Sequence, residues 1–299
     1  MQKVSIIVPT YNRAVFLKEA LESILKQDYH NIEIIISDNA STDNTTEVVK
    51  AFNDERIIYH KQIENIGMVG NHNKALELCS GEYIHIFSDD DIMLQSCIRR
   101  KVEILNQFPS VGLVHSDIYI INGEGNISSK ENWAKSAWKK WGDLHSQNQL
   151  FNHNVYHKYL YRIRNFITMP SVMIRRSVID KVGYMDEQLK YVIDWDYWLK
   201  ITLFYDAYYL NEKLVSYRIY LNNIYNEMKD KDHKKDHEIM IKNIHKSFPG
   251  DSIIKNNIFH ELLRVGGYYT NYSLINPMNY VLKSALPFIP FEKLKKRFF

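Results

Sequence analysis

Residues 82–93, "EYIHIFSDDDIM", join an alternating apolar run to three consecutive aspartates, Asp89, Asp90 and Asp91. The alternation predicts a buried strand. Three carboxylates at the end of such a strand repel one another, so they indicate either a bound cation or a solvated turn with a helix cap. Successive side chains diverge on an extended chain, so at most two aspartates can face a metal. We expect the third to serve the N-terminus of the next helix, and for Asp91 alone the capping and metal roles stay open.

The residues before this stretch alternate between short apolar runs and helical patterns. Strands are predicted at residues 4–8, 32–37, 56–60 and 82–88, with helices between them. This order favours right-handed crossover units around a mostly parallel sheet. The polar clusters "PTYNR", "SDNASTDN", "NIG" and "SDDD" follow the four strands, at the edge where such sheets bind ligands. Any one cluster could only cap a helix or form a turn, but the four together predict a ligand site.

The composition bounds the class of protein. The chain has 299 residues, of which 45% are hydrophobic and 24% charged, and its formal net charge is +3. These values are typical of a soluble globular protein, and the charge is too small to indicate nucleic-acid binding. The only two cysteines, Cys79 and Cys97, favour a reducing compartment. The first apolar run stops at Pro9, unlike a signal peptide, and residues 265–282 are too polar for a membrane span, so we expect a cytoplasmic protein.

Five segments carry a resemblance to a known family. In chain order they are "VSIIVPTYNR", "IIISDNASTDNT", "NIGMVGNHNKAL", "GEYIHIFSDDDIM" and "VIDWDYWLKI". Together they resemble the family-2 glycosyltransferases over about residues 3–220. The resemblance implies the GT-A fold, which is a Rossmann-like α/β fold with a mostly parallel central sheet flanked by helices. It also implies a nucleotide-sugar donor, with a UDP- or dTDP-sugar expected, and inverting transfer to an acceptor hydroxyl.

The resemblance assigns roles on the donor side. Pro9, Thr10 and Tyr11 would lie against the nucleobase, Asp38 would hydrogen-bond it, and Asn65 of the "NIG" cluster would also contact the donor.

The resemblance also places a metal, Mn²⁺ or Mg²⁺, at the aspartates. Asp90 is similar in position to the last aspartate of the family's metal-binding Asp-x-Asp motif, whereas the first falls on Ser88. Asp89 is therefore expected to contact the ribose or to be a second metal ligand. Arg218 is expected to contact phosphate, because Tyr220 stands where the family often has a histidine for the diphosphate.

The segment "VIDWDYW" carries the expected catalytic base. Asp194 matches the family's basic aspartate, although Ile193 stands where a glutamate is common. A carboxylate there would take the proton of the acceptor hydroxyl. The alternative is a helix N-cap, and the two roles are compatible. Asp196 is expected to face away or brace a neighbour, and His157, four residues after His153, is expected on a helix surface.

The remaining regions give weaker signals. Residues 112–126 predict a strand pair joined by a glycine turn, and Trp133, Trp138 and Trp141 either stack on sugar rings or pack on the core. The end of the chain, residues 288–299, mixes basic and aromatic residues, as in segments that contact anionic membranes, although a frayed tail or a dimer contact is nearly as compatible.

We expect three parts: a donor-binding half of the GT-A domain (1–120), an acceptor-binding half (121–223) and a helical C-terminal extension (224–299). The function predicted is metal-dependent, inverting glycosyl transfer to a glycan or lipid-linked acceptor, in bacterial surface polysaccharide synthesis. The alternatives are a sugar nucleotidyltransferase, which related sheets also support, and a non-catalytic glycan-binding module. The latter would need neither the aspartate cluster nor Asp194.

Overall fold

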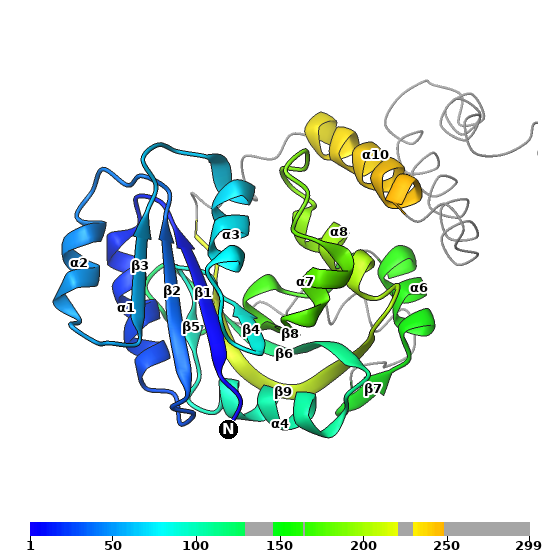
Figure 1. The fold of residues 1–299 in the computed structure, drawn as a ribbon, viewed down its shortest axis with the longest axis horizontal. Helices are drawn as coiled ribbons and strands as arrows, with labels where there is room; N and C mark the ends of the chain where they lie inside the picture. The colour runs from blue at the N-terminus through cyan, green and yellow to red at the C-terminus, as the bar shows by residue number, and fades with distance from the viewer. Residues whose placement is uncertain (129–145, 164, 221–229, 248–299) are drawn as a thin grey trace, which may run out of the picture. The chain divides into compact units, whose positions relative to one another are not determined.

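The computed structural model describes residues 1–128, 146–163, 165–220 and 230–247 (Figure 1). The chain divides into two compact units, residues 1–240 and 241–299, and the fold below is that of the first unit together with the last residues of a helix, 230–247, that crosses the boundary. Of the second unit, the structure describes residues 241–247. Trp133, Trp138 and Trp141, the basic-aromatic tail (288–299) and residues 265–282 lie outside the described residues. Within the described residues, no helix is both long and apolar enough to span a membrane.

The first half alternates strands and helices, as its sequence predicts. Its elements are β1 (Val4–Thr10), α1 (Ala14–Leu25), β2 (Ile32–Asp38), α2 (Thr45–Ala51), β3 (Ile57–Lys61), α3 (Gly67–Glu77), β4 (Tyr83–Ile86), β5 (Ile92–Met93) and α4 (Cys97–Gln107).

Strands β3, β2, β1 and β4 are neighbours in that order and all parallel. Helices α1 and α2 lie on one face of these strands and α3 lies on the other (Figure 1). Every residue of β1 and β2 is buried, which explains why the first five positions of each strand are apolar except for Ser5 and Glu33. On α1 the buried positions recur at helical spacing, at Leu17, Leu21 and Ile24.

The second half extends the same sheet. Its elements are β6 (Val111–Ile121), β7 (Gln149–Phe151), α6 (His153–Ile163), η1 (Met169–Ser171), β8 (Val172–Arg175), α7 (Ser177–Val182), α8 (Ile193–Ile201), β9 (Asp206–Arg218) and α10 (Asp230–Ser247).

The nine-stranded sheet has the order β3-β2-β1-β4-β8-β6-β9-β5, with β7 paired to β9. β8 runs antiparallel to both β4 and β6, and β9 runs parallel to β6 but antiparallel to β5 and β7. Helix α4 covers one face of β6 and β9, and α6, α7 and α8 lie on the other (Figure 1). The α/β class with a helix-flanked central sheet is confirmed, and the antiparallel pairs confine the parallel arrangement mainly to the first half.

Three local predictions were wrong. Residues 112–126 do not form a strand pair, because β6 is one long strand, and among the residues described after its turn (up to 128) only Ile127 bridges back to it, as an isolated bridge to Ile121. His157 is on α6 but buried, since its ring nitrogen Nδ1 lies 3.1 Å from the Thr202 hydroxyl. Asp91 does not cap the next helix, because β5 intervenes and α4 begins six residues later at Cys97.

Candidate active site

The loops that follow β1, β2 and β3 bind one another at the carboxyl edge of the sheet. Asn12, at the positive φ of 54°, accepts the Thr42 backbone N–H at 2.7 Å. Asn39 donates its side-chain N–H to the side-chain oxygen Oδ1 of Asn65 at 2.8 Å, and its own Oδ1 accepts the Ile66 N–H at 2.9 Å. Asn tolerates the left-handed backbone region better than most residues, which suits Asn12 to this turn. The hydrogen bonds between the loops fix the shape of this edge of the site.

The residues predicted to contact the nucleobase lie at this edge, with different exposure. Pro9 and Thr10 are buried within β1, whereas Tyr11, the first residue after it, exposes 44% of its surface. Asp38, at the end of β2, is fully buried, and its carboxylate accepts the Ser41 N–H at 2.8 Å and the Tyr59 hydroxyl at 2.5 Å. Of this group, Tyr11 is therefore the side chain most open to a ligand.

Asp89 and Asp90 converge on one cationic group. A single guanidinium nitrogen of Arg13, Nη1, lies 3.1 Å from Asp89 Oδ1 and 3.1 Å from Asp90 Oδ2. The Tyr220 hydroxyl donates to the same Asp90 oxygen at 3.1 Å. Both carboxylates are largely buried, since Asp89 exposes 4% and Asp90 8% of its surface. The two side chains therefore face a common point, as the sequence predicts for two aspartates of the three.

Asp91 points the other way, into the sheet. Its Oδ1 accepts the Arg218 backbone N–H at 2.7 Å, and its side chain is fully buried. The Arg218 guanidinium binds the Asp90 carbonyl oxygen at 2.7 Å, the Gly123 carbonyl oxygen at 2.9 Å and the Glu19 carboxylate at 2.5 Å. Arg218 exposes 1% of its surface. These contacts hold the backbone of the triplet in place, and they favour a scaffolding role over the predicted contact with phosphate.

The protonation of the triplet reflects its burial. Burial raises the pKa of Asp89 to about 6, with Arg13 opposing this rise and Asp90 adding to it. Burial also raises the pKa of Asp91 well above its ordinary value, and the nearby Asp90 charge adds to the effect. Burial alone would lower the pKa of Arg13, but the charges of Asp89 and Asp90 outweigh it and raise that pKa. The guanidinium charge thus opposes the effect of burial on the pKa of Asp89.

Asp194 lies in the first turn of α8. It does not cap the helix as the alternative reading predicts, because α8 begins at Ile193 after the N-cap residue Val192. Its Oδ2 accepts the Asn165 side-chain N–H at 2.6 Å, and its Oδ1 accepts the Trp195 N–H at 2.7 Å. Burial raises its pKa to about 6, although both hydrogen bonds favour the charged form.

Asp196, two residues further along α8, is a different kind of carboxylate. It is fully buried and forms an ion pair with Lys200 at 2.6 Å, one helical turn away. It braces the helix from inside, which agrees with its expected role.

The sheet order brings Asp194 to the same edge as the triplet. Ile86, the last residue of β4, pairs with Val172, the first residue of the antiparallel strand β8. The residues just before β8 therefore lie beyond the carboxyl end of β4, which is also where Asp89 begins the triplet. Asn165 belongs to this segment, and it holds Asp194 by a direct hydrogen bond.

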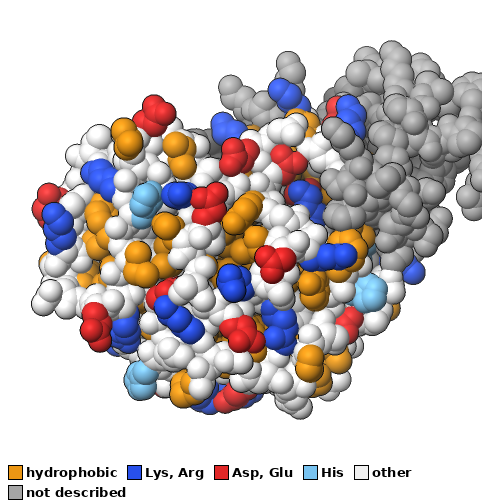
Figure 2. Space-filling model, viewed as in Figure 1, with side chains coloured by type: hydrophobic (Ala, Val, Ile, Leu, Met, Phe, Trp, Pro, Cys, Tyr) orange, Lys and Arg blue, Asp and Glu red, His pale blue; other side chains and the backbone are white. Residues whose placement is uncertain are grey.

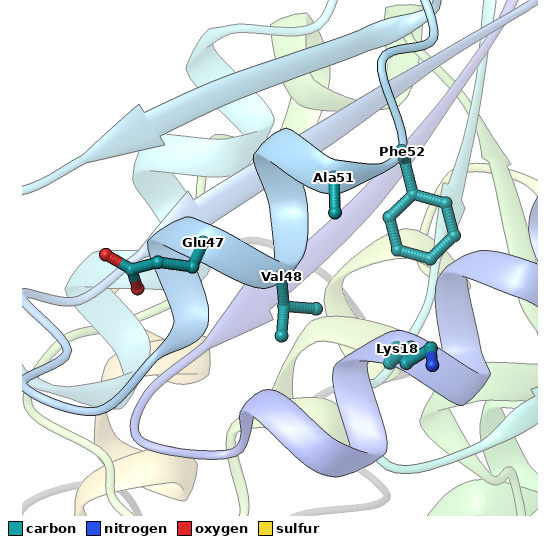
Figure 3. Close-up of a pocket in the computed structure, with 5 residues that line it drawn as sticks. All are labelled: Lys18, Glu47, Val48, Ala51 and Phe52. Carbon is teal, nitrogen blue, oxygen red and sulfur yellow. The ribbon is translucent and has the colours of Figure 1, made fainter.

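Three side chains at this edge were missed as site residues. Arg13 and Tyr220 contact Asp90, and Asn165 contacts Asp194. Arg13 stands in the "PTYNR" cluster, so the sequence could have indicated it as a site residue. Asn165 follows a segment without a strand or helix motif of the family, so the sequence did not indicate it. The hollow of about 350 Å³ between α1 and α2, shown in Figure 3, contains none of the predicted site residues. Figure 2 shows acidic and basic side chains interspersed over the visible face of the described residues.

The residues present fit a divalent cation at Asp89 and Asp90. The guanidinium of Arg13 is a stand-in cation, because it is held by one oxygen from each carboxylate. In the described part of the chain, no cluster of three or more histidine, cysteine or acidic side chains could hold a metal. A cation here would thus have two carboxylate ligands and leave its other positions to water or phosphate oxygens, the arrangement common for Mg²⁺.

The fold and the site define a class of protein. A helix-flanked sheet with aspartates at the ends of its parallel strands, and a further aspartate on a helix at the same edge, is typical of nucleotide-sugar glycosyltransferases with the GT-A fold. The model of the family "Glycosyl transferase family 2" matches residues 5–183, more than half of the chain. The chain belongs to this family, which confirms the glycosyltransferase class over the two alternatives.

Relatives with curated names agree. An uncharacterised glycosyltransferase of Methanocaldococcus jannaschii is 29% identical over 221 residues, which are 72% of this chain and 70% of that protein. A GalNAc(5)-diNAcBac-PP-undecaprenol beta-1,3-glucosyltransferase of Campylobacter jejuni is 38% identical over 134 residues, which are 44% of this chain and 42% of that protein.

Solved structures show the same fold. The S. aureus TarS 1–349 structure in complex with UDP-GlcNAc has a TM-score of 0.71 at 16% identity and covers 94% of this chain and 79% of its own. The mannosyltransferase PcManGT from Pyrobaculum calidifontis, in complex with GDP-Man and Mn²⁺, has a TM-score of 0.59 at 16% identity and covers 99% of this chain and 83% of its own.

Proposed function

We propose that this chain is a metal-dependent, inverting glycosyltransferase that moves a sugar from a UDP- or dTDP-sugar to a hydroxyl of a glycan or lipid-linked acceptor. The observation that carries the proposal is the pair of aspartates, Asp89 and Asp90, converging on one cationic group at the carboxyl edge of the parallel strands. A third aspartate, Asp194, is at the same edge with its pKa raised to about 6 by burial. Together they supply a cation site and a base.

On the donor side, Tyr11 offers the exposed ring for the nucleobase, and Asp38 and Asn65 shape the loops around it. Asp90, with Asp89, would hold Mn²⁺ or Mg²⁺. When bound, such a cation offsets the negative charge of the departing nucleoside diphosphate. Pro9 and Thr10 are buried at the end of β1, directly before Tyr11 in the chain, and their proposed contribution is to fix the backbone from which Tyr11 extends.

On the acceptor side, Asp194 takes the proton of the acceptor hydroxyl as its oxygen attacks the anomeric carbon. The new carbon–oxygen bond forms on the face opposite the breaking bond to phosphate, and the bonding electron pair leaves with the diphosphate. A base with its pKa near 6 is ionised at neutral pH and still accepts a proton in the transition state. Asn165 occupies one lone pair of Oδ2 and the Trp195 N–H one lone pair of Oδ1, which leaves the remaining lone pairs of both oxygens for the substrate.

The acceptor class is suggested by a relative, since the Campylobacter jejuni protein is named as acting on an undecaprenol-linked sugar. Such an acceptor suits the synthesis of a bacterial surface polysaccharide at the inner face of the cell membrane, by a cytoplasmic protein. We assign donor binding to residues 1–120, acceptor binding to residues 121–223 and a helical extension to residues 224–299. This division assigns binding roles and not separate domains, because one sheet contains strands from both of the first two parts.

Calorimetry tests the donor side. Nucleotide-sugars are first ranked by their thermal stabilisation of the protein with and without Mn²⁺, because a ligand that binds only the folded state raises its melting temperature. The nucleoside diphosphate of the best donor is then titrated into the wild type and Asp90→Asn. We expect binding to depend on Mn²⁺ in the wild type and to lose that dependence in the variant.

The matched control is Asp54→Asn, which breaks a surface pair with Arg56 far along the chain from the triplet. It should bind the diphosphate as the wild type does. Equal affinities in the wild type and Asp90→Asn, with and without Mn²⁺, would refute the assignment of the cation site.

A further inference from the structure

One side chain at the site has a geometry that the proposed chemistry does not use. Arg13 belongs to the turn between β1 and α1, and its Nη1 bridges Asp89 and Asp90 at equal distances of 3.1 Å. A surface ion pair usually joins one cation to one carboxylate and contributes little to stability. Here one guanidinium nitrogen is shared by two largely buried carboxylates, which have no other cation among the ion pairs of the described residues.

The surroundings keep the guanidinium in this position. Its carbon Cζ lies 6.0 Å from the centre of the Tyr220 ring, within the range of a cation–π contact. Tyr220 in turn packs on Phe16 of α1, with ring centres 5.2 Å apart, and donates its hydroxyl to Asp90. The Arg13 side chain nevertheless exposes 28% of its surface, so it has an open side through which it can leave.

A divalent cation and this guanidinium cannot both use the same oxygens. Mg²⁺ binds carboxylate oxygens at about 2.0–2.1 Å, so it would sit about 1 Å closer to each oxygen than Nη1 does. Two positive groups so close together would also repel each other in a partly buried site. The carboxylates need only small movements to accept the cation, but Arg13 must move out.

We propose that Arg13 is the resident counter-ion of the cation site and exchanges with the divalent cation. Without metal it neutralises Asp89 and Asp90, and on metal binding it swings toward solvent, so its contacts set the metal affinity. The inference rests on the proposed cation site. It makes Arg13 a positioning residue that competes with the metal for the two carboxylates.

The exchange can be measured with Mn²⁺ alone, by calorimetry at pH 8, in the wild type and in three variants. Arg13→Gln removes the competing charge, and its affinity for Mn²⁺ should rise by roughly tenfold, since a charge-assisted hydrogen bond is worth about that factor. Arg13→Lys keeps a charge but loses the planar fork, so its affinity should rise by only a few-fold. Arg56→Gln is the matched control, because Arg56 is similarly exposed and ion-paired, and it should bind Mn²⁺ as the wild type does.

Thermal unfolding separates this role from a purely structural one. Metal-free Arg13→Gln should melt below the wild type, because two buried carboxylates are left without a counter-ion, and Mn²⁺ should raise its melting temperature by more than it raises that of the wild type. A structural arginine would give the lower melting temperature without the larger response to Mn²⁺. If Arg13→Gln does not fold, the few-fold gain of Arg13→Lys decides the question.

Two negative results have different meanings. Asp90→Asn, titrated with Mn²⁺ in the same way, tests the cation site itself. If this variant loses Mn²⁺ binding while both Arg13 variants bind Mn²⁺ as tightly as the wild type or more weakly, the exchange is overturned and the cation site stays in place. An absence of Mn²⁺ binding in the wild type and all variants would overturn both proposals.

Discussion

Replacing Asp194 with asparagine separates the chemistry of this site from its stability. The two side chains have nearly the same shape, but asparagine cannot take a proton from the acceptor hydroxyl. Turnover should therefore fall by roughly 10²–10⁴-fold, the usual contribution of a general base. Donor affinity should be unchanged, because Asp194 contacts Asn165 and Trp195 and none of the residues assigned to the donor.

The raised pKa of Asp194 adds a second, independent readout. Its value of about 6 exceeds the ordinary 3.8 by about two pH units, because burial disfavours the charged form. At 1.36 kcal/mol per unit this corresponds to about 3 kcal/mol, which partial exposure reduces to about 1–2 kcal/mol. The folded state binds the proton more tightly than the unfolded chain, so ionisation of Asp194 costs stability between about pH 4 and pH 6.

Urea denaturation across pH 4–8 measures this cost. The free energy of unfolding of Asp194→Asn minus that of the wild type should rise by about 1–2 kcal/mol from pH 4 to pH 6 and then stay level. Fixed effects, such as a hydrogen bond lost to Asn165, cancel in this change with pH. Asp180→Asn, on the exposed surface of α7, is the control and should leave turnover unchanged.

Activity of Asp194→Asn within a few-fold of the wild type, on a verified acceptor, would show that another group is the base. A difference in stability that does not vary with pH would show instead that burial does not raise this pKa.

Three further outcomes follow from other contacts. Glu33→Gln should lower the free energy of unfolding by about 2–3 kcal/mol at pH 7. Burial by itself would raise the pKa of Glu33, but hydrogen bonds from Lys3 and neighbouring donors outweigh this effect and lower that pKa to about 2. This stability is present above pH 4.5 and lost as the pH falls toward 2, so urea denaturation should show the deficit shrinking at pH 3, and a constant deficit would contradict the cause. Asn165→Ala removes a donor to the charged form of Asp194, so the acidic limb of the pH–rate profile should move to higher pH; an unmoved limb would mean that Asn165 does not tune the base. Deletion of residues 288–299 should weaken sedimentation with anionic liposomes and leave donor hydrolysis intact, and equal sedimentation would rule out a membrane role for this tail.

The sequence determined the parts of the fold that short-range patterns encode. The apolar runs that end at Pro9 and Ser88 predict β1 and β4 to within a few residues, and the structure confirms both strands. Because parallel strands end at one edge of a sheet, the sequence alone predicts that the polar clusters after them lie together. The ordered motifs were sufficient to indicate the family, which the family match confirms.

Only the tertiary structure decided which groups neutralise the buried carboxylates. Arg13 meets Asp89 and Asp90 across 76 and 77 residues of chain, and Arg218 reaches the backbone of Asp90 across 128. The insertion of β8 antiparallel to β4, which carries Asn165 and with it Asp194 to this edge, is equally invisible in any local period. Strand and helix patterns depend on the burial of neighbouring residues along the chain, whereas the pairing of charges depends on which distant segments the order of the sheet brings together.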